Sequence, residues 1–257
     1  MKKLFLFLFF VSSLSAFSFS PYENYLLSGQ PTHVALFAEA KDVDALNTAL
    51  STLHTKSATK SFKKVKISNI SSYSKQLQGK TWFLVYFDYE GSTYLDAVKS
   101  FESVPAVQAL KPLLSPHPRA KSYGTTWLQL EWINYIHASQ KKGAATDQFS
   151  MVTRIKPERE QEYRILHQTV WPGVVDQMAR GNYRNFSIFF VELGDELYEF
   201  FYVEYVGTNA AKDGEKNKAD PCNQRWWKLT DPCQNPLPDA DGIWSMMDKG
   251  SKNNSKK

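Results

Sequence analysis

The sequence predicts an α+β fold made of two similar β-α-β-β-α-β units in one chain. The first observation is an internal repeat: WFLVYFDYEG at 82–91 aligns with YEFFYVEYVG, 116 positions further on at 198–207. The same shift aligns VPAVQALKPL at 104–113 with DPCNQRWWKL at 220–229 without a gap. The second observation is that each copy alternates apolar, strand-like runs with segments that carry helix start signals. A constant offset over separate segments indicates a duplicated unit.

Each unit is expected to follow the same element order. An apolar run forms the first strand, and a helix follows; Pro157 suits a first helical turn, and Gly181-Asn182 is a stop signal. Turn residues around Gly79 and Gly194-Asp195 then predict a hairpin in each unit. A second helix begins near Pro105 and Pro221. The expected ranges are 33–40 and 149–156 for the first strands, 42–53 and 157–178 for the first helices, 65–73 with 81–89 and 183–192 with 197–205 for the hairpins, and 125–133 and 242–247 for a last strand that closes each unit.

This order is the ferredoxin-like arrangement, which gives a four-stranded antiparallel sheet with helices on one face. The other face needs a cover, and two units in one chain can supply it by packing sheet to sheet. We therefore expect tandem ferredoxin-like units that form an α+β barrel within one chain, joined by the polar linker 137–148. The expected organisation is a signal peptide at 1–20, a degenerate unit at 21–137, a second unit at 138–248 and a basic disordered tail at 249–257.

The first 20 residues have the pattern of a secretory signal peptide: two lysines, an apolar run from Leu4 to Val11, and then small residues. The alternative is a membrane anchor, but the apolar run is shorter than the roughly 20 residues that a spanning helix needs. We expect cleavage after Ala16 or Ser18 and a periplasmic or secreted protein that has no membrane association once the signal is removed.

The net charge of +5 does not predict a nucleic-acid surface. Six of the 31 basic residues lie in 1–20 and 249–257, which leaves 25 against 26 acidic residues in the body of the chain. The two cysteines, Cys222 and Cys233, could oxidise in an exported protein, or a helix between them could hold them apart. Two cysteines and dispersed histidines give no metal-site spacing, and we expect neither a metal nor a cofactor.

A possible ligand site lies on the first helix of the second unit. Tyr163, His167 and Trp171 are spaced i, i+4, i+8, so a single helix would place a phenol, an imidazole and an indole along one face. Such a face is flat and apolar in body but has hydrogen-bonding tips, which suits a sugar. The alternative is ordinary core packing around a satisfied histidine.

Two adjacent tryptophans, Trp226 and Trp227, support the ligand interpretation. Neighbouring residues on a helix point about 100° apart, so one ring could pack the helix while the other faces a cavity. Arg225 and Lys228 could bind hydroxyls or only solvate the helix. At the offset of 116, the first unit lacks the tyrosine, the histidine and both tryptophans. The second unit is therefore expected to hold the site, with the first as its structural partner.

These residues carry a family resemblance. Residues 149–247 resemble the L-rhamnose mutarotases through EYRILHQTVWP, NFSIFFV and CNQRWWKL, in that order. The resemblance implies a dimeric α+β barrel, here imitated within one chain, and hence a monomeric pseudo-dimer that binds a small sugar without a cofactor. It implies that His167 is the catalytic acid/base and that Tyr163, Trp226 and Trp227 contact the sugar. The family has a sugar-contacting tyrosine where this chain has Phe186, and Tyr183 is expected on the opposite strand face.

The predicted activity is the interconversion of the α and β anomers of L-rhamnose or a related sugar, an isomerase reaction of carbohydrate metabolism. Histidine suits it because one imidazole can accept and return a proton near neutral pH. Three other functions remain open: a non-catalytic sugar-binding protein, another α+β-barrel enzyme such as a monooxygenase or a haem-degrading enzyme, and an interaction module anchored by its tryptophans. The segment AAKDGEKNKAD before the tryptophan helix is expected to reshape the pocket.

Overall fold

A computed structural model describes residues 31–91, 93–136 and 143–250. The chain divides into two units, Met1–Pro31 and Thr32–Lys257, and all described residues after Pro31 belong to the second. The predicted signal peptide and residues 251–257 lie outside the described residues. No helix in the described part is both long and apolar enough to cross a membrane.

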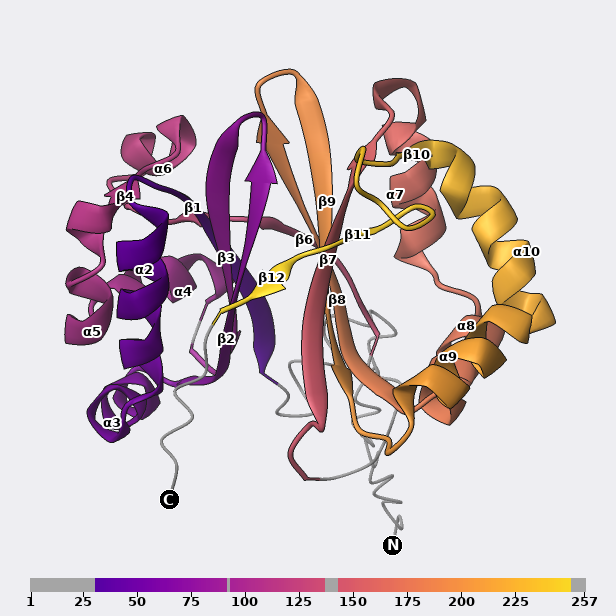
Figure 1. Ribbon diagram of the computed structural model, residues 1–257, viewed down its shortest axis with the longest axis horizontal. Coiled ribbons are helices and arrows are strands. Elements are labelled where there is room, and N and C mark those ends of the chain that lie inside the picture. Colours follow the sequence, from indigo (N-terminus) through magenta and orange to yellow (C-terminus); the bar gives the residue numbers. More distant parts are fainter. Residues whose placement is uncertain (1–30, 92, 137–142, 251–257) are drawn as a thin grey trace, which may run out of the picture. The chain divides into compact units, whose positions relative to one another are not determined.

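Two antiparallel sheets form the centre of the part Thr32–Lys257, which makes the fold α+β as predicted (Figure 1). The first sheet has the order β12-β2-β3-β1-β4, with β5 also paired to β1. Its strands are β1 (Thr32–Ala40), β2 (Ile67–Leu77), β3 (Lys80–Tyr89), β4 (Leu114–Ser115), β5 (Leu128–Gln129) and β12 (Asp248–Lys249).

The second sheet has the order β10-β7-β9-β8-β6, with β11 also paired to β7. Both predicted hairpins are present, and each is turned by a residue with positive φ, Gly79 in the first and Gly194 in the second. The strands of this sheet are β6 (Glu131–Ile136), β7 (Asp147–Ile155), β8 (Tyr183–Leu193), β9 (Glu196–Tyr205), β10 (Gln234–Asn235) and β11 (Ser245–Met246).

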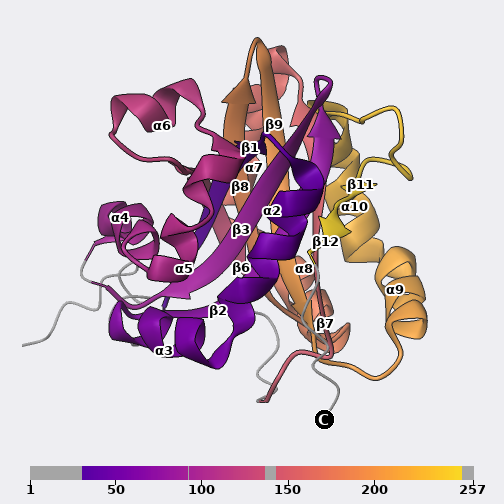
Figure 2. The same cartoon turned by 60° about the vertical axis from the view of Figure 1, so that its left-hand side comes forward.

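Helices cover the outer face of each sheet, and Figure 2 brings those of the first half forward. The expected helix 42–53 is α2 followed by the short 3₁₀ turn η1, and sequence reasoning missed α3. The first half contains α2 (Val43–Leu50), η1 (Ser51–His54), α3 (Lys56–Lys64), η2 (Tyr94–Asp96), α4 (Ala97–Glu102), α5 (Pro105–Gln108), η3 (Lys111–Leu113) and α6 (Pro118–Ser122). The second contains η4 (Pro157–Arg159), α7 (Glu160–Gln168), α8 (Pro172–Arg180), α9 (Ala210–Ala219), α10 (Pro221–Thr230) and η5 (Asp231–Cys233).

Strand alternation divides the core into layers. On β3, Phe83 and Val85 pack toward the helices of the first half, whereas Leu84 and Tyr86 point between the two sheets. There they join residues of the second sheet such as Phe200 in one apolar cluster. The sheets therefore cover each other's inner faces, as the sequence predicts.

The ranges expected to close each unit contain β5 and β11, which pair with β1 and β7 of their own sheets, as predicted. The strands that follow them, β6 and β12, join the opposite sheets, which was not predicted. Strand β6 pairs with β8 of the second sheet, and β12 pairs with β2 of the first. Strands β8 and β2 would otherwise be unpaired sheet edges, and pairing satisfies their backbone groups. Lys249, which we expected in the tail, lies in β12 and donates to Asp147 over 2.9 Å.

The two halves match in detail at their second strands. A register shift interrupts β2 between Ser68 and Ser71, and another interrupts β8 between Arg184 and Ser187. Asn69 and Asn185, again 116 positions apart, have φ values of 53° and 52° at these irregularities. Asparagine tolerates this left-handed conformation better than most residues, which suits it to a bulge. A common origin of the two halves stays a prediction.

Candidate functional site

A cavity of about 490 Å³ lies within the second half of the chain. It lies between the outer face of the second sheet and the helices α7, α8 and α10, whose side chains form its walls. This volume is within the range of about 300–1,000 Å³ that is usual for small-molecule sites. Five of the predicted site residues line the cavity: Tyr163, His167, Phe186, Trp226 and Trp227.

Trp171 does not line the cavity, and the single helix expected at 157–178 is wrong. Helix α7 ends at Gln168, and α8 begins at Pro172 with Trp171 as its N-cap. Proline lacks an amide hydrogen and disfavours a helical conformation in the residue before it, so the helix cannot continue through this position. Trp171 instead packs edge-on against Trp226, with ring centroids 5.4 Å apart. It therefore contacts a ring that lines the cavity without lining the cavity itself.

Helix α7 places Tyr163 and His167 side by side. They are one turn apart, and their rings stack with centroids separated by 4.1 Å and planes inclined by 25°. Both side chains are buried, with 1% and 5% of their surfaces exposed. Tyr163 and His167 therefore lie next to each other, as their helical spacing predicts.

The hydrogen bonding of His167 defines its tautomer. Its Nδ1 lies 3.0 Å from the backbone carbonyl oxygen of Tyr163. A carbonyl oxygen only accepts, so Nδ1 carries the hydrogen and Nε2 of the neutral ring keeps a lone pair. Burial lowers the pKa of His167 from 6.5 to about 4, so the ring is neutral at neutral pH. The cavity therefore contains a neutral imidazole that can accept a proton.

Helix α10 supplies the tryptophan pair. Asp220 caps the helix by accepting from the amides of Cys222 and Asn223, and Pro221 occupies its first turn. Trp226 is 6% exposed and packs edge-on against His167 with centroids 5.3 Å apart. Trp227 is half-buried, and both tryptophans line the cavity. The two rings thus serve one site.

Charged residues beside the tryptophans stay outside this site. Arg225 and Lys228 are exposed, and neither lines the cavity. Helix α9, which contains most of the segment expected to reshape the pocket, instead contributes Asn217 and Lys218 to the lining.

Phe186 faces the cavity from β8 and packs against Phe201 with centroids 5.0 Å apart. Tyr183 lines the same cavity, so placing it on the opposite strand face was wrong. The register shift between Arg184 and Ser187 inserts a residue into the alternation, which returns a side chain three positions away to the same face. Tyr183 consequently supplies a hydroxyl on the strand that carries Phe186.

Sequence reasoning missed Glu199, a carboxyl that is 0% exposed on β9. The hydroxyl of Tyr163 donates to its Oε1, and Nε2 of Gln234 donates to its Oε2 over 3.0 Å. Burial raises the pKa of Glu199 to about 8. One signal was available: Glu199 is a charged residue in the middle of the aromatic strand LYEFFYV.

The loop after β10 completes the cavity and was also missed. Ile243 and Trp244 line it, and Trp244 packs edge-on against Phe201 with centroids 4.7 Å apart. Gly242 turns this loop with a φ of 70°, and a bridge joins Asp241 to Trp244. We expected 242–247 to form a strand, but only Ser245–Met246 form one, so the lining role of Ile243 and Trp244 was not recognised.

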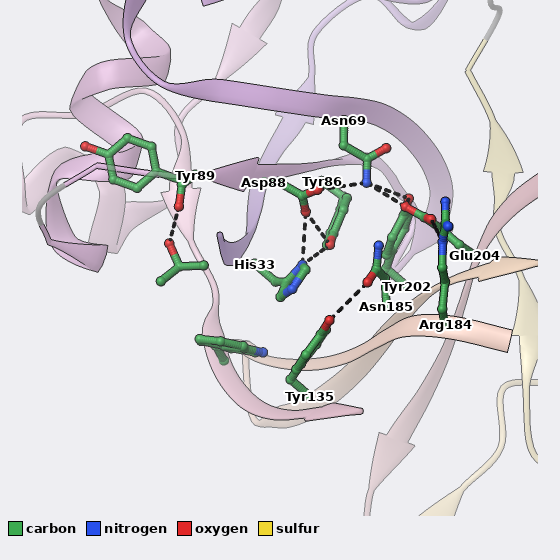
Figure 3. Close-up of polar contacts among 12 residues, drawn as sticks. His33, Asn69, Tyr86, Asp88, Tyr89, Tyr135, Arg184, Asn185, Tyr202 and Glu204 are labelled. Carbon is green, nitrogen blue, oxygen red and sulfur yellow. Dashed lines mark hydrogen bonds and ion pairs between the residues drawn. The ribbon is translucent and has the colours of Figure 1, made fainter. Parts of the chain in front are cut away.

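A separate polar cluster lies between the sheets (Figure 3). The hydroxyl of Tyr86 donates to Asp88 over 2.8 Å, and Nδ1 of His33 lies 3.0 Å from the same carboxylate. Asn69 connects Asp88 to Glu204 of the second sheet through its amide, at 3.1 and 2.6 Å. The rings of Tyr86 and its counterpart Tyr202 stack across the interface at 3.4 Å. These contacts join the two halves and lie outside the cavity.

Neither cysteine is in a disulfide: Cys222 is partly exposed on α10, and Cys233 is buried in η5. Within the described ranges, no group of three or more His, Cys, Asp or Glu side chains could hold a metal ion.

Comparison with known proteins places the mutarotase resemblance in the same half as the cavity. Residues 148–249 match the family model described as L-rhamnose mutarotase, which confirms the resemblance read from the sequence. An L-rhamnose mutarotase of Oceanobacillus iheyensis is 25% identical over 81 residues, which cover 32% of this chain and 73% of that protein. Sugar mutarotase is thus the family-level similarity of the second half.

Similar solved structures extend over both halves. A putative monooxygenase of Fusobacterium nucleatum is 10% identical, with 86% of this chain and 93% of that chain covered at a TM-score of 0.49. A putative monooxygenase of Lactobacillus acidophilus is 8% identical, with coverages of 86% and 95% and a TM-score of 0.49. An anthrone oxidase-like protein is 8% identical, with coverages of 86% and 94% and a TM-score of 0.41.

Proposed function

We propose that this protein is a mutarotase that interconverts the α and β anomers of L-rhamnose or a related sugar, with His167 as the acid/base. The observation that carries the proposal is the state of His167. Its Nδ1 is committed to the Tyr163 carbonyl, so a neutral imidazole presents its basic nitrogen in a cavity walled by Trp226 and Trp227. The mutarotase resemblance of residues 148–249 supports the same reaction.

The reaction needs a proton acceptor and a proton donor. Opening the pyranose ring removes the proton of the anomeric hydroxyl, forms the carbonyl, breaks the bond to the ring oxygen and protonates that oxygen. Nε2 of His167 takes the anomeric proton and returns it when the ring closes on the other face of the carbonyl. General acid–base catalysis of this kind contributes roughly 10²–10⁴-fold. The tryptophan rings stack on C–H faces of the sugar and keep water from the reacting atoms.

The lining favours a sugar with few hydroxyls. Apolar side chains form much of the cavity, among them Phe149, Ile188 and Val203. Phe186 adds no hydroxyl on β8. L-rhamnose carries a methyl group at C6, and burying a methyl against such a wall is favourable where burying an unpaired hydroxyl is costly.

The test is saturation transfer between the two anomeric proton signals of a sugar at equilibrium, with and without the purified protein. We expect faster exchange for L-rhamnose and L-fucose, whose C6 is a methyl group, than for D-galactose, which has a hydroxyl on C6. A protein that broadens the sugar signals without accelerating exchange is a sugar-binding protein, which contradicts the enzymatic proposal.

The apolar lining also supports a second candidate, a monooxygenase that acts on a small aromatic substrate. Phe149, Phe186 and Trp244 give the cavity aromatic surface against which a small aromatic molecule can pack. Consumption of oxygen with an aromatic substrate, together with unchanged anomer exchange for all three sugars, would favour this candidate over the mutarotase.

We further propose that residues 1–20 direct export and that the mature chain is a monomeric pseudo-dimer. The composition of the N-terminal segment supports export, and the mutual covering of the two sheets supports a monomer. Mass spectrometry of the protein from a periplasmic or culture fraction should give a new N-terminus after Ala16 or Ser18. Light scattering of the mature protein should give the mass of one chain; the mass of two would contradict the monomer.

A further inference from the structure

Glu199 occupies a position that the proposed chemistry has not yet used. Strand alternation places it on the same side of β9 as Phe201 and Val203, which line the cavity. Glu199 itself does not line the cavity, but both of its hydrogen-bond partners, Tyr163 and Gln234, do. A fully buried carboxyl is thus separated from the cavity by one phenol and one amide.

Among the described residues, no ion pair joins Glu199 to a lysine, an arginine or a histidine; the neighbouring arginines pair with other carboxylates. Tyr163 on α7 donates to it, and Cys233 in η5 is its other titratable neighbour. Tyr163 is in turn influenced by Asp231 and stacks on His167, and Cys233 is influenced by Lys156, Arg159 and Glu162. Its cross-strand neighbours, Thr153 on β7 and Phe190 on β8, carry no charge. An ionised carboxylate without a cation is costly in such surroundings, so the acid form predominates at neutral pH.

The acid form has a donor that the ionised form lacks. A protonated Glu199 has one O–H group, which can donate to the phenol oxygen of Tyr163. The Tyr163 hydrogen is then free to turn toward the cavity. Burial raises the pKa of Tyr163 well above its usual range, so the phenol keeps a proton and passes one on only as it receives another.

We propose that Tyr163 and Glu199 form a proton relay that serves the ring oxygen of the sugar, opposite His167. The inference rests on the proposed mutarotase function and assigns its second proton-transfer group. As the bond between C1 and the ring oxygen breaks, Tyr163 gives its proton to that oxygen and takes the proton of Glu199, while His167 accepts the anomeric proton. Ring closure reverses every transfer, so no proton is gained or lost. Tyr163 contacts the substrate, and Glu199 is a positioning residue that acts through it.

The test is the pH dependence of anomer exchange in wild type, Glu199→Gln and Tyr163→Phe. Glutamine has nearly the same shape and can donate to Tyr163 while accepting from Gln234, so the wall is kept and only the transferable proton is lost. In wild type, we expect the exchange rate to fall as the pH rises through about 8. Both variants should lose this decrease, and their rates at pH 7 should drop by about 10²-fold, the lower end of general acid–base catalysis. Glu192→Gln removes an exposed carboxyl from the neighbouring strand β8 and serves as the matched control, with unchanged rate and pH profile.

Glu199→Gln with the wild-type rate and the wild-type decrease near pH 8 would overturn the relay while leaving the mutarotase function intact. A wild-type protein that accelerates exchange of no sugar would overturn the function and the relay together. A carbon-13 NMR titration of the glutamate carboxyls, with Glu199→Gln to assign the signal, tests the pair without activity. The Glu199 signal should titrate near pH 8, and titration near pH 4 would overturn the relay.

Discussion

His167→Asn should change how the stability of the protein depends on pH. Asparagine keeps a short donor that can reach the Tyr163 carbonyl, but it cannot titrate. In the wild type, the imidazole has a pKa of about 4 in the folded state, compared with 6.5 when exposed. The unfolded chain therefore binds a proton below pH 6.5 that the folded chain does not take up until about pH 4. Folding stability from this group is fully present above pH 6.5 and is lost as the pH falls.

The two pKa values determine the magnitude. Each pKa unit corresponds to about 1.4 kcal/mol, so the wild type should lose about 2.5 kcal/mol between pH 7 and pH 4.5 through this one residue. The variant lacks that loss, and all other titrating groups are shared. We therefore expect the free energy of unfolding, measured by urea denaturation, to fall by about 2.5 kcal/mol more in the wild type than in the variant between pH 7 and pH 4.5.

A difference in unfolding free energy between the two proteins that stays constant from pH 7 to pH 4.5 would contradict the lowered pKa of His167. It would mean that His167 takes up its proton as readily in the folded protein as in the unfolded chain. The imidazole would then be accessible to water, and neither the closed wall beside Trp226 nor the neutral tautomer would describe it.

Three further predictions concern the same half of the chain. In the wild type, the free energy of unfolding should fall by about 2 kcal/mol from pH 6 to pH 8, because the raised pKa makes the folded state hold a proton that the unfolded state has released. Glu199→Gln should not show this decrease; urea denaturation at both pH values that gives the same decrease in both proteins would contradict the prediction. Phe186→Tyr adds the hydroxyl that the mutarotase resemblance implies at this position and should increase exchange of L-rhamnose, measured by saturation transfer; an unchanged rate would show that β8 does not contact the sugar. Gly173→Ala should destabilise the protein by at most about 1 kcal/mol in thermal unfolding, because its Cβ would lie 2.6 Å from Sγ of Cys222, and adding Cys222→Ala should make the protein more stable than Gly173→Ala alone.

Elements that depend on local signals were predictable from the sequence. The β8–β9 hairpin has two runs of apolar and aromatic residues around a glycine turn, and the structure places its strands within one residue of the expected ends. Helix α10 has a proline in its first turn and an aspartate cap, which is why the tryptophan pair could be placed on a helix. Tyr163 and His167 lie one turn apart on a helix, so their contact also follows from spacing.

Features that depend on long-range pairing were not predictable. The exchange of β6 and β12 between sheets depends on which edges are left open, and no local pattern records this. The bulge in β8 reverses the expected side of Tyr183 because one inserted residue changes the alternation. The hydrogen bonds of Glu199 come from Tyr163 on helix α7 and Gln234 on the short strand β10, both distant from Glu199 in the sequence.

Trp171 marks the boundary between these two cases. The spacing i, i+8 from Tyr163 predicts one shared face only if the helix is unbroken, and Pro172 breaks it. The proline was visible in the sequence, so this error came from giving the periodicity more weight than the backbone chemistry.

The proposed function requires that a neutral His167 in the tryptophan-walled cavity catalyses anomer exchange. The most direct measurement is the optical rotation of freshly dissolved α-L-rhamnose at pH 7, followed with no protein, with the wild type and with His167→Asn. We expect the wild type to bring the rotation to its equilibrium value faster than buffer alone, and the variant to be slower than the wild type by about 10²-fold or more. Wild type and variant with the same rate, whether equal to that of buffer or faster, would contradict the claim.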